Sequence, residues 1–242
     1  MIALVLLPGL DGTGLQLTNL VASFGSEVKI IVASYPTNVV LDYPELESIA
    51  RSFLPQDQPF ILLGESFSGP IAISIAASRP PGLRGLVLCC SFARNPLPSF
   101  AALRPLLCIA PVASLPLSLL SFFVLGRFSS PALRQSLAES LAQVSPSVLR
   151  ARVRAVLSVD RSAALSRIDV PMLYLRAAED RLVPRSASQE IVGLAPATKV
   201  VEFSAPHFLL QVLPSQAATT IHKFSVTIAP TMRLKADGYA AA

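Results

Sequence analysis

One short segment in the first third of the chain constrains the fold more than any other. The apolar run of residues 60–63 ends at Gly64, and Ser66 follows two residues later. The small residues Ser68 and Gly69 come next, before another apolar stretch. This order is typical of a sharp, strained strand-to-helix turn that lifts a serine hydroxyl out of a sheet. The first N–H groups of the following helix would face any negative charge forming beside the serine. The segment therefore predicts an enzyme with Ser66 as its nucleophile.

The segment resembles the nucleophile elbow of the α/β-hydrolase superfamily, whose pattern is Gly-x-Ser-x-Gly. Gly64 and Ser66 occupy the first and third positions here, but Ser68 occupies the fifth, and Gly69 comes one residue later. Serine is small enough for the same turn, so the departure affects the formal match more than the geometry. A Gly-x-Ser string at a strand end also arises by chance. Three further features of the chain favour the functional interpretation.

The first feature is the beginning of the chain, where the apolar run 2–7 is broken sharply by residues 8–14. In the superfamily, the loop after this strand supplies half of an oxyanion hole, and a histidine usually stands where this chain has a proline. The resemblance implies that the backbone N–H groups of Leu10 and Phe67 would stabilise the oxyanion. A nucleotide-binding loop is the alternative, but the glycines lack the required spacing and no Lys-Ser/Thr follows them. We expect Asp11 to shape the loop.

The second feature is the scarcity of histidine, since the chain contains only His207 and His222. A base that activates Ser66 must be one of them. His207 follows the strand-like run 199–203 and opens a helical pattern, which places it on a loop after a strand. His222 lies beside Lys223 near the end of that pattern, where a solvated histidine is the ordinary explanation. The superfamily carries its base on the loop after the last strand, and the resemblance therefore implies His207.

The third feature is an acidic residue after a buried strand. The run 170–176 predicts a strand, and Glu179 and Asp180 follow it. The superfamily's acid lies on this loop, commonly as aspartate followed by x-apolar-apolar-Pro, and Asp180 fits that pattern. It would accept the second imidazole N–H and hold the correct tautomer. The adjacent Glu179 is the main rival. The order Ser66, Asp180, His207 agrees with the order of this fold.

Strand-like and helical patterns alternate along most of the chain. Strand-like runs fall near residues 2–7, 28–34, 59–64, 85–90, 171–176 and 198–203. Helical patterns fall near residues 14–23, 44–54, 68–78, 185–194 and 207–224. This alternation predicts an α/β fold with a mostly parallel, doubly wound sheet of about six strands. The resemblance implies a compact α/β-hydrolase fold. Ligand chemistry then belongs at the carboxyl ends of the strands.

The alternation stops between residues 92 and 165, an interval too long for one crossover helix. It is rich in Leu, Ser, Pro and Arg and predicts several helices separated by prolines. The superfamily inserts a cap here, so we expect a hydrolase core of residues 1–91 and 166–224 and a helical cap of residues 92–165. Residues 225–242 lose the helical pattern, and we expect a loose tail or a remnant of cloning there.

Residues 105–126 carry no charged side chain and are long enough to cross a bilayer. Pro111 and Pro116 interrupt the run, however, and a membrane span here would separate Ser66 from His207. An apolar lid that lines an acyl-binding pocket is the better interpretation. We also expect such a lid to make transient contact with a lipid surface.

The composition excludes several other classes of protein. Apolar residues make up 52% of the 242 residues and charged residues only 14%, so extensive disorder is not expected. The net charge is +5, but no pattern of alternating basic and aromatic residues accompanies it. We therefore expect Arg150, Arg152 and Arg154 to lie on a solvated helix face, and no nucleic acid to bind.

Cysteine usage bears on the compartment and on metal binding. Cys89, Cys90 and Cys108 have no metal-binding spacing and indicate no disulfide framework. The adjacent pair ends a strand-like run and is expected to fill space as small apolar groups. This usage favours a reducing cytoplasm, and the N-terminal run is expected to be a strand rather than a signal peptide. No metal or organic cofactor is implied.

Taken together, these features predict a carboxylic-ester hydrolase that uses Ser66, His207 and Asp180 and forms an acyl-enzyme. The apolar insertion favours small-molecule esters with apolar acyl or aryl groups. The fold alone does not separate ester hydrolysis from thioester hydrolysis or acyl transfer. The loop 7–12 also resembles plant ester-forming relatives, which makes acyl transfer the nearest enzymatic alternative. A non-catalytic binder of apolar ligands is the alternative outside catalysis, and the oligomeric state stays open.

Overall fold

The computed structural model describes residues 2–26, 28–98 and 116–228. Within them, six parallel strands form one sheet in the order β2-β1-β3-β4-β5-β6. The strands are β1 Ala3–Leu7, β2 Ile30–Val32, β3 Phe60–Glu65, β4 Leu83–Cys89, β5 Met172–Ala177 and β6 Lys199–Phe203. The predicted α/β fold with a parallel, doubly wound sheet of about six strands is confirmed.

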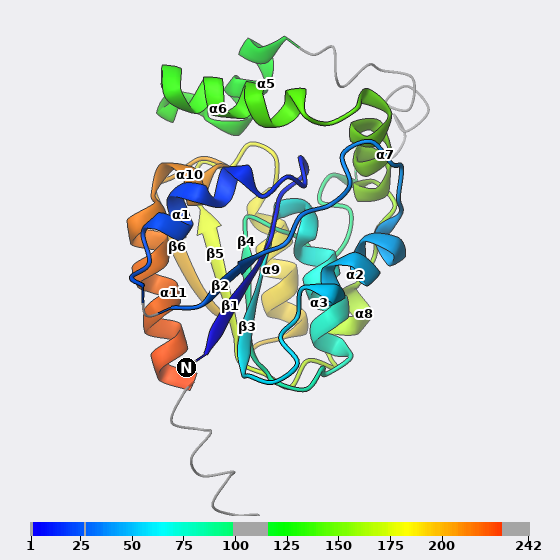
Figure 1. Cartoon of the computed structure of the whole chain (residues 1–242), viewed down its shortest axis with the longest axis vertical. Helices are drawn as coiled ribbons and strands as arrows, with labels where there is room; N and C mark the ends of the chain where they lie inside the picture. The colour runs from blue at the N-terminus through cyan, green and yellow to red at the C-terminus, as the bar shows by residue number, and fades with distance from the viewer. Residues whose placement is uncertain (1, 27, 99–115, 229–242) are drawn as a thin grey trace, which may run out of the picture.

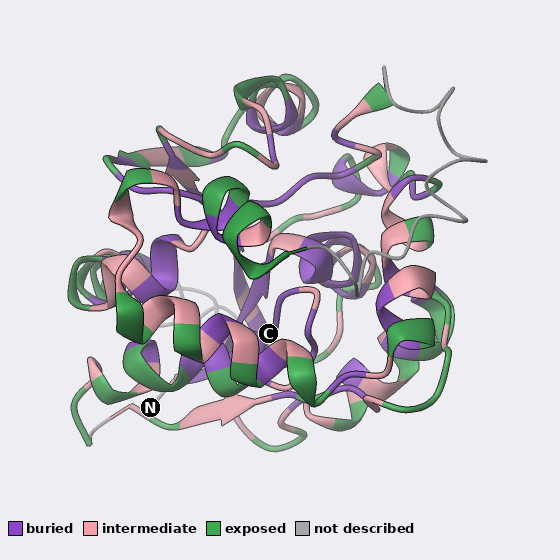
Figure 2. Cartoon of the chain, turned by 90° about the horizontal axis from the view of Figure 1, so that it is seen from above, coloured by how far each residue is buried: buried purple, intermediate pink, exposed green. Residues whose placement is uncertain are grey.

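Helices cover both faces of this sheet (Figure 1). One face packs against α1 Thr18–Ala22, α10 Leu209–Val212 and α11 Pro214–Ile228. The other packs against α2 Tyr43–Ser52, α3 Gly69–Ala77, α8 Ser162–Leu165 and α9 Arg185–Leu194. Every residue of β1 and β3 is buried, as expected for strands covered on both faces. Seen from above, buried residues gather in the centre and exposed residues lie on the outer sides of the helices (Figure 2).

The sequence around Asp42 shows how a local signal begins one of these helices. The Asp42 carboxylate accepts a hydrogen bond of 2.9 Å from the N–H of Glu45, and the Glu45 carboxylate accepts one of 2.8 Å from the N–H of Asp42. This capping box satisfies N–H groups that have no acceptor within the helix. Helix α2 then packs against α3, the helix that follows Ser66.

The C-terminal helical segment differs from the prediction at both ends. The single helix expected over residues 207–224 is two helices, because Pro214 has no N–H to continue α10 and begins α11 instead. Helix α11 also continues to Ile228, so residues 225–228 are not part of a tail. Ile228 is 7% exposed and lies beside Phe224 over Gly85, where an added Cβ would be 3.0 Å from both side chains. Residues 229–242 lie outside the described residues.

Four helices occupy the described part of the interval between β4 and β5. Helices α5 Leu117–Val124 and α6 Pro131–Ala142 lie above the carboxyl ends of the strands, with α7 Pro146–Val156 to one side (Figure 1). We call these three the inserted helices. Helix α8 instead packs against α3 and α9, and its Ala164 and Leu165 join the core of the sheet. The last residues of the expected cap therefore pack with the hydrolase core.

The apolar run of residues 105–126 is described only in part. Residues 105–115 lie outside the described residues, and the remainder includes α5, which has eight residues. Among the described helices, none combines the length and the apolar character needed to cross a bilayer.

Replacing Ile228 with Ala tests whether the last turn of α11 belongs to the core. The substitution removes buried methyl and methylene groups over Gly85, so we expect a loss of about 2 kcal/mol in the free energy of unfolding. Val226→Ala is the control, because Val226 is 55% exposed and should change stability by less than about 0.5 kcal/mol. Chemical denaturation measures both values. Equal effects would show that the final turn does not pack as described.

Candidate active site

The turn after β3 places Ser66 at the carboxyl edge of the sheet. Ser66 has a φ of +46°, an uncommon conformation for a residue other than glycine. A Cβ on Gly64 would lie 2.7 Å from the Cβ of Ala72, and one on Gly69 would lie 1.6 Å from the Oγ of Ser91. Both glycines are therefore required by close packing around the turn. The expected strand-serine-helix turn is present at this position.

Ser68, the departure from the family pattern, has a defined structural place. Its side chain is fully buried, and its Oγ donates a hydrogen bond to the carbonyl of Pro8. Ser68 Oγ also lies 2.9 Å from the hydroxyl of Tyr35. The serine is thus accommodated and links the turn at Ser66 to the loop that follows β1.

The three residues predicted as nucleophile, base and acid form one hydrogen-bonded chain. His207 Nε2 lies 2.8 Å from Ser66 Oγ, and His207 Nδ1 lies 2.8 Å from Asp180 Oδ2. Asp180 is held by its Oδ1, which accepts hydrogen bonds of 2.8 Å from the N–H groups of Leu182 and Val183. The loops after β3, β5 and β6 supply one member each, so the parallel sheet brings them together.

The charges around His207 favour a basic imidazole. Burial alone would lower the pKa of His207, but the charge and hydrogen bond of Asp180, together with the charge of Glu65, raise that pKa above its usual value. Glu179 and His222, the rivals for the acid and base roles, lie outside this hydrogen-bonded chain. Glu179 forms a two-bond ion pair with Arg127, at 2.6 and 2.7 Å, which lowers the pKa of its carboxyl. His222 is exposed on α11.

The two predicted oxyanion donors lie in the turn at Ser66 and in the loop after β1. Phe67 follows Ser66 in the first turn of a helical segment, so its N–H has no acceptor within the helix. Its carbonyl accepts a hydrogen bond of 3.1 Å from Tyr43, whose ring stacks on that of Phe67 at 4.9 Å. Leu10 lies in the loop after β1, where the N–H of Gly12 donates to the carbonyl of Gly9 at 3.1 Å.

Arg152, predicted to lie on a solvated helix face, is instead 2% exposed, and that prediction was wrong for this residue. Its guanidinium donates to the carbonyls of Leu10 at 2.9 Å, Asp11 at 2.6 Å and Pro36 at 2.9 Å. Val148 and Arg152 lie four residues apart on the buried face of α7. That spacing in an apolar pattern was the signal that could have identified the arginine as buried.

Glu65 is a second functional candidate that the sequence analysis did not identify. It directly precedes Ser66, is buried, and accepts a hydrogen bond of 2.8 Å from Gln211 Nε2. The backbone of Gly9 also hydrogen bonds to its carboxylate. Burial is the main cause that raises the pKa of Glu65 to about 7; the negative charge of Asp11 adds to it, whereas Gln211 and His207 oppose it. A charge at the end of an apolar strand was the available signal.

One group of side chains has donor types that could suit a metal ion. Ligand atoms of Cys90, Asp180 and His207 lie within 4.8 Å of one another. Both nitrogens of His207 are already engaged by Asp180 and Ser66. The hydrogen bond with Cys89, together with burial, raises the pKa of the Cys90 thiol well above its usual value. The group is therefore poorly suited to metal binding, which requires a thiolate.

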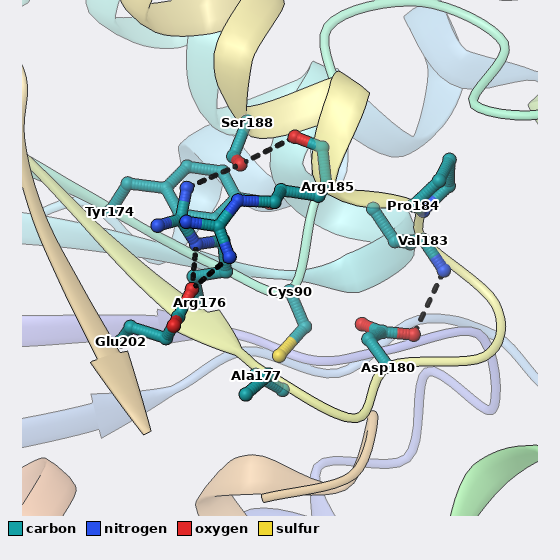
Figure 3. A pocket seen from close by; sticks show the side chains of 11 residues that line it. Cys90, Tyr174, Arg176, Ala177, Asp180, Val183, Pro184, Arg185, Ser188 and Glu202 are labelled. Carbon is teal, nitrogen blue, oxygen red and sulfur yellow. Dashed lines mark hydrogen bonds and ion pairs between the residues drawn. The ribbon is translucent and has the colours of Figure 1, made fainter. Parts of the chain in front are cut away.

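A polar cavity of about 310 Å³ adjoins Asp180 (Figure 3). Arg176 and Arg185 both pair with Glu202 in this cavity, at 2.7 and 2.9 Å. Cys90 and Asp180 line the opposite side of the view (Figure 3). The two arginines and Glu202 are thus engaged with one another, whereas Asp180 hydrogen bonds to the imidazole of His207.

Comparison with known proteins identifies the class that this fold and site define. A model of the alpha/beta hydrolase family matches residues 4–219. The chain belongs to this family.

Among curated proteins, the chain is 29% identical to monoglyceride lipase of Mus musculus over 208 residues, which are 81% of this chain and 66% of that protein. It is 26% identical to monoglyceride lipase of Rattus norvegicus over 198 residues, which are 77% and 60% of the two chains. The chain thus spans a little under two thirds of the length of these relatives.

Two solved structures show the likeness in fold. An enol-lactonase from Burkholderia xenovorans LB400 has a TM-score of 0.79 and 14% identity, covering 93% of this chain and 91% of the other. A thermophilic esterase from Thermogutta terrifontis has a TM-score of 0.79 and 16% identity, covering 94% and 90%. Both likenesses concern the fold.

Replacing Glu65 with Gln tests the buried carboxyl. The pKa of the Glu65 carboxyl is near 4.5 in the unfolded chain and about 7 in the folded protein, so the wild type loses folding stability as the pH rises between these values. Glu65→Gln has no carboxyl at this position and does not lose stability in this way. The stability of Glu65→Gln relative to the wild type should therefore increase across this range, by on the order of 3 kcal/mol. Chemical denaturation at several pH values measures the difference.

The exposed Glu139→Gln is the control for this experiment, since its stability relative to the wild type should not change with pH in this way. A pH-independent difference for Glu65→Gln would show that Glu65 titrates normally. Any constant offset reflects the altered hydrogen bonds to Gln211 and Gly9.

Proposed function

We propose that this protein is a serine carboxylesterase that uses Ser66, His207 and Asp180 as a catalytic triad. The observation that carries the proposal is the hydrogen-bonded chain from Asp180 through His207 to Ser66, with both bonds at 2.8 Å. The serine at its end stands on a strained turn at the carboxyl edge of a parallel sheet. This combination matches the geometry that activates a serine hydroxyl for attack on a carbonyl.

The proposed reaction begins when His207 Nε2 accepts the proton of the Ser66 hydroxyl. Ser66 Oγ attacks the ester carbonyl, and the N–H groups of Leu10 and Phe67 stabilise the resulting oxyanion. His207 then protonates the departing alcohol, which leaves an acyl group on Ser66. Water, deprotonated by His207, attacks this acyl-enzyme, and His207 returns the proton to Ser66 Oγ as the carboxylic acid leaves. Asp180 holds the imidazole tautomer and stabilises its charged form in both halves.

The surroundings of His207 support esters with apolar acyl or aryl groups as substrates. Phe208, the next residue, packs in an apolar cluster with Val124 of α5, the following Leu125, and Leu137 of α6. Its N–H also donates to the carbonyl of Val124 at 3.3 Å. The inserted helices thus act as a cap that brings apolar side chains to the edge of the site. The resemblance to monoglyceride lipases agrees with a lipid-like ester.

Hydrolysis of p-nitrophenyl butyrate by the wild type and by Ser66→Ala tests the proposal. Loss of the nucleophile should lower kcat by at least about 10⁴-fold, in line with triad serines elsewhere. The exposed Ser52→Ala is the matched control and should retain wild-type activity. The wild type should also hydrolyse p-nitrophenyl esters with longer acyl chains. Mass spectrometry of the acyl-enzyme should find the acyl group on Ser66. Unchanged activity in Ser66→Ala, or an inactive wild type, would contradict the esterase proposal.

We further propose that α5 contacts lipid surfaces. Four of its eight residues are large, apolar and between 37 and 54% exposed, namely Leu117, Leu119, Phe122 and Phe123. The guanidinium of Arg181 lies 4.2 Å from the ring of Phe122, and Arg127 is exposed nearby in the segment after α5. Arg127 is paired with Glu179, so Arg181 supplies the positive charge beside these apolar side chains, a combination that suits the interface of an anionic bilayer.

Cosedimentation with vesicles of mixed neutral and anionic phospholipid tests this contact. The double substitution Phe122→Ser and Phe123→Ser should reduce the bound fraction severalfold, because it removes most of the exposed aromatic surface of α5. Val39→Ser combined with Val40→Ser is the control, since these valines are similarly exposed, at 49 and 54%, but lie before α2. Equal binding by all three proteins would contradict a role for α5.

A further inference from the structure

The loop after β1 has a hydrogen bond on each of its five carbonyls from Pro8 to Gly12. Ser68 Oγ donates to Pro8, the Gly12 N–H donates to Gly9, and the Tyr35 N–H donates to Gly12 at 2.7 Å. The remaining two carbonyls, those of Leu10 and Asp11, accept from a single nitrogen, Arg152 Nη1. Each of these five peptide groups is thus held in its orientation, and Arg152 holds two of the five.

These carbonyl bonds decide where the Leu10 N–H points. In a trans peptide the carbonyl and the N–H point in opposite directions. The Gly9 carbonyl turns toward Gly12, so the Leu10 N–H of the same peptide points away from that turn. Arg152 holds the next two peptides, which close the turn. If its guanidinium were absent, those carbonyls would lose their donor, and the turn would lose its constraint.

The cost of burying this guanidinium indicates a specific role. An arginine that is 2% exposed loses its hydration, and no carboxylate forms an ion pair with it among the residues described. Three carbonyls and the ring of Tyr35, whose centroid is 5.8 Å from Cζ, take the place of water. The loop is matched to it, because a Cβ on Gly12 would lie 2.5 Å from Nη1.

We propose that Arg152 is a positioning residue for the reaction, which holds the loop after β1 so that the Leu10 N–H faces the developing oxyanion. This inference rests on the proposed esterase function. Arg152 comes from α7, so one of the inserted helices completes the oxyanion hole of the core. Since the oxyanion forms only in the transition state, loss of this positioning should lower kcat far more than it changes KM.

The variants Arg152→Met and Arg152→Lys test the proposal in the full-length protein. Methionine keeps much of the volume but has no donors, and lysine keeps the charge but cannot reach three carbonyls with a planar fork. Arg150→Met, on the same helix, is the matched control. We expect kcat for p-nitrophenyl butyrate to fall about 10²-fold in both Arg152 variants, with KM within about threefold of the wild-type value. The control should keep both constants.

Amide hydrogen exchange of residues 9–12 supplies a readout independent of turnover. Exchange there should accelerate at least tenfold in Arg152→Lys and Arg152→Met, but not in Arg150→Met. Unchanged loop exchange, unchanged kcat, or a change confined to KM in a folded variant would overturn the proposal. If Arg152→Met does not fold, Arg152→Lys decides. A wild type inactive on esters, with loop exchange still dependent on Arg152, would instead overturn the esterase assignment and leave Arg152 as a structural clamp.

Discussion

The backbone turn at Ser66 is the constraint on which the rest of the site depends. A φ of +46° at a residue with a side chain costs on the order of 1–3 kcal/mol and persists only where surrounding packing requires it. The buried strand β3 enters the turn, and α3, buried along nearly its whole length, leaves it. Gly64 and Gly69 allow the approach of neighbouring atoms that any side chain would block. The packing of the core therefore stabilises a partly exposed position for Ser66 at the edge of the sheet.

Buried charges around this turn are satisfied in different ways. Asp180 accepts two backbone N–H groups and faces His207, so it favours the charged imidazole. Glu65 has fewer donors, and burial raises its pKa to about 7. Arg152 has carbonyl partners in place of a carboxylate. Asp180 thus raises the pKa of His207, the proposed base. Glu65 and Arg152 hold backbone segments instead, because Glu65 contacts Gly9 and Arg152 contacts Leu10.

The sequence predicted those features that depend on strand order and local turns. Six strand-like runs, and the position of Ser66, Asp180 and His207 just after three of them, were enough to predict their meeting, because parallel strands end at one edge of the sheet. Arg152 was not predicted to be buried, because the neighbouring arginines favour a solvated face and outweighed its four-residue spacing from Val148. Its partners are backbone carbonyls more than 100 residues away in the chain, which carry no sequence signal.

The inserted helices contact three of the loops that carry proposed site residues, those of Leu10, Asp180 and His207. Arg152 of α7 binds the loop of Leu10, and Phe208, next to His207, donates to Val124 of α5. The loop of Asp180 is bound through its neighbours, since Arg181 donates to the carbonyl of Phe122 at 2.8 Å and Glu179 pairs with Arg127. A movement of the helices that admits substrate would thus disturb all three loops. Under the proposed function, these contacts would couple the position of the inserted helices to the positions of Leu10, Asp180 and His207.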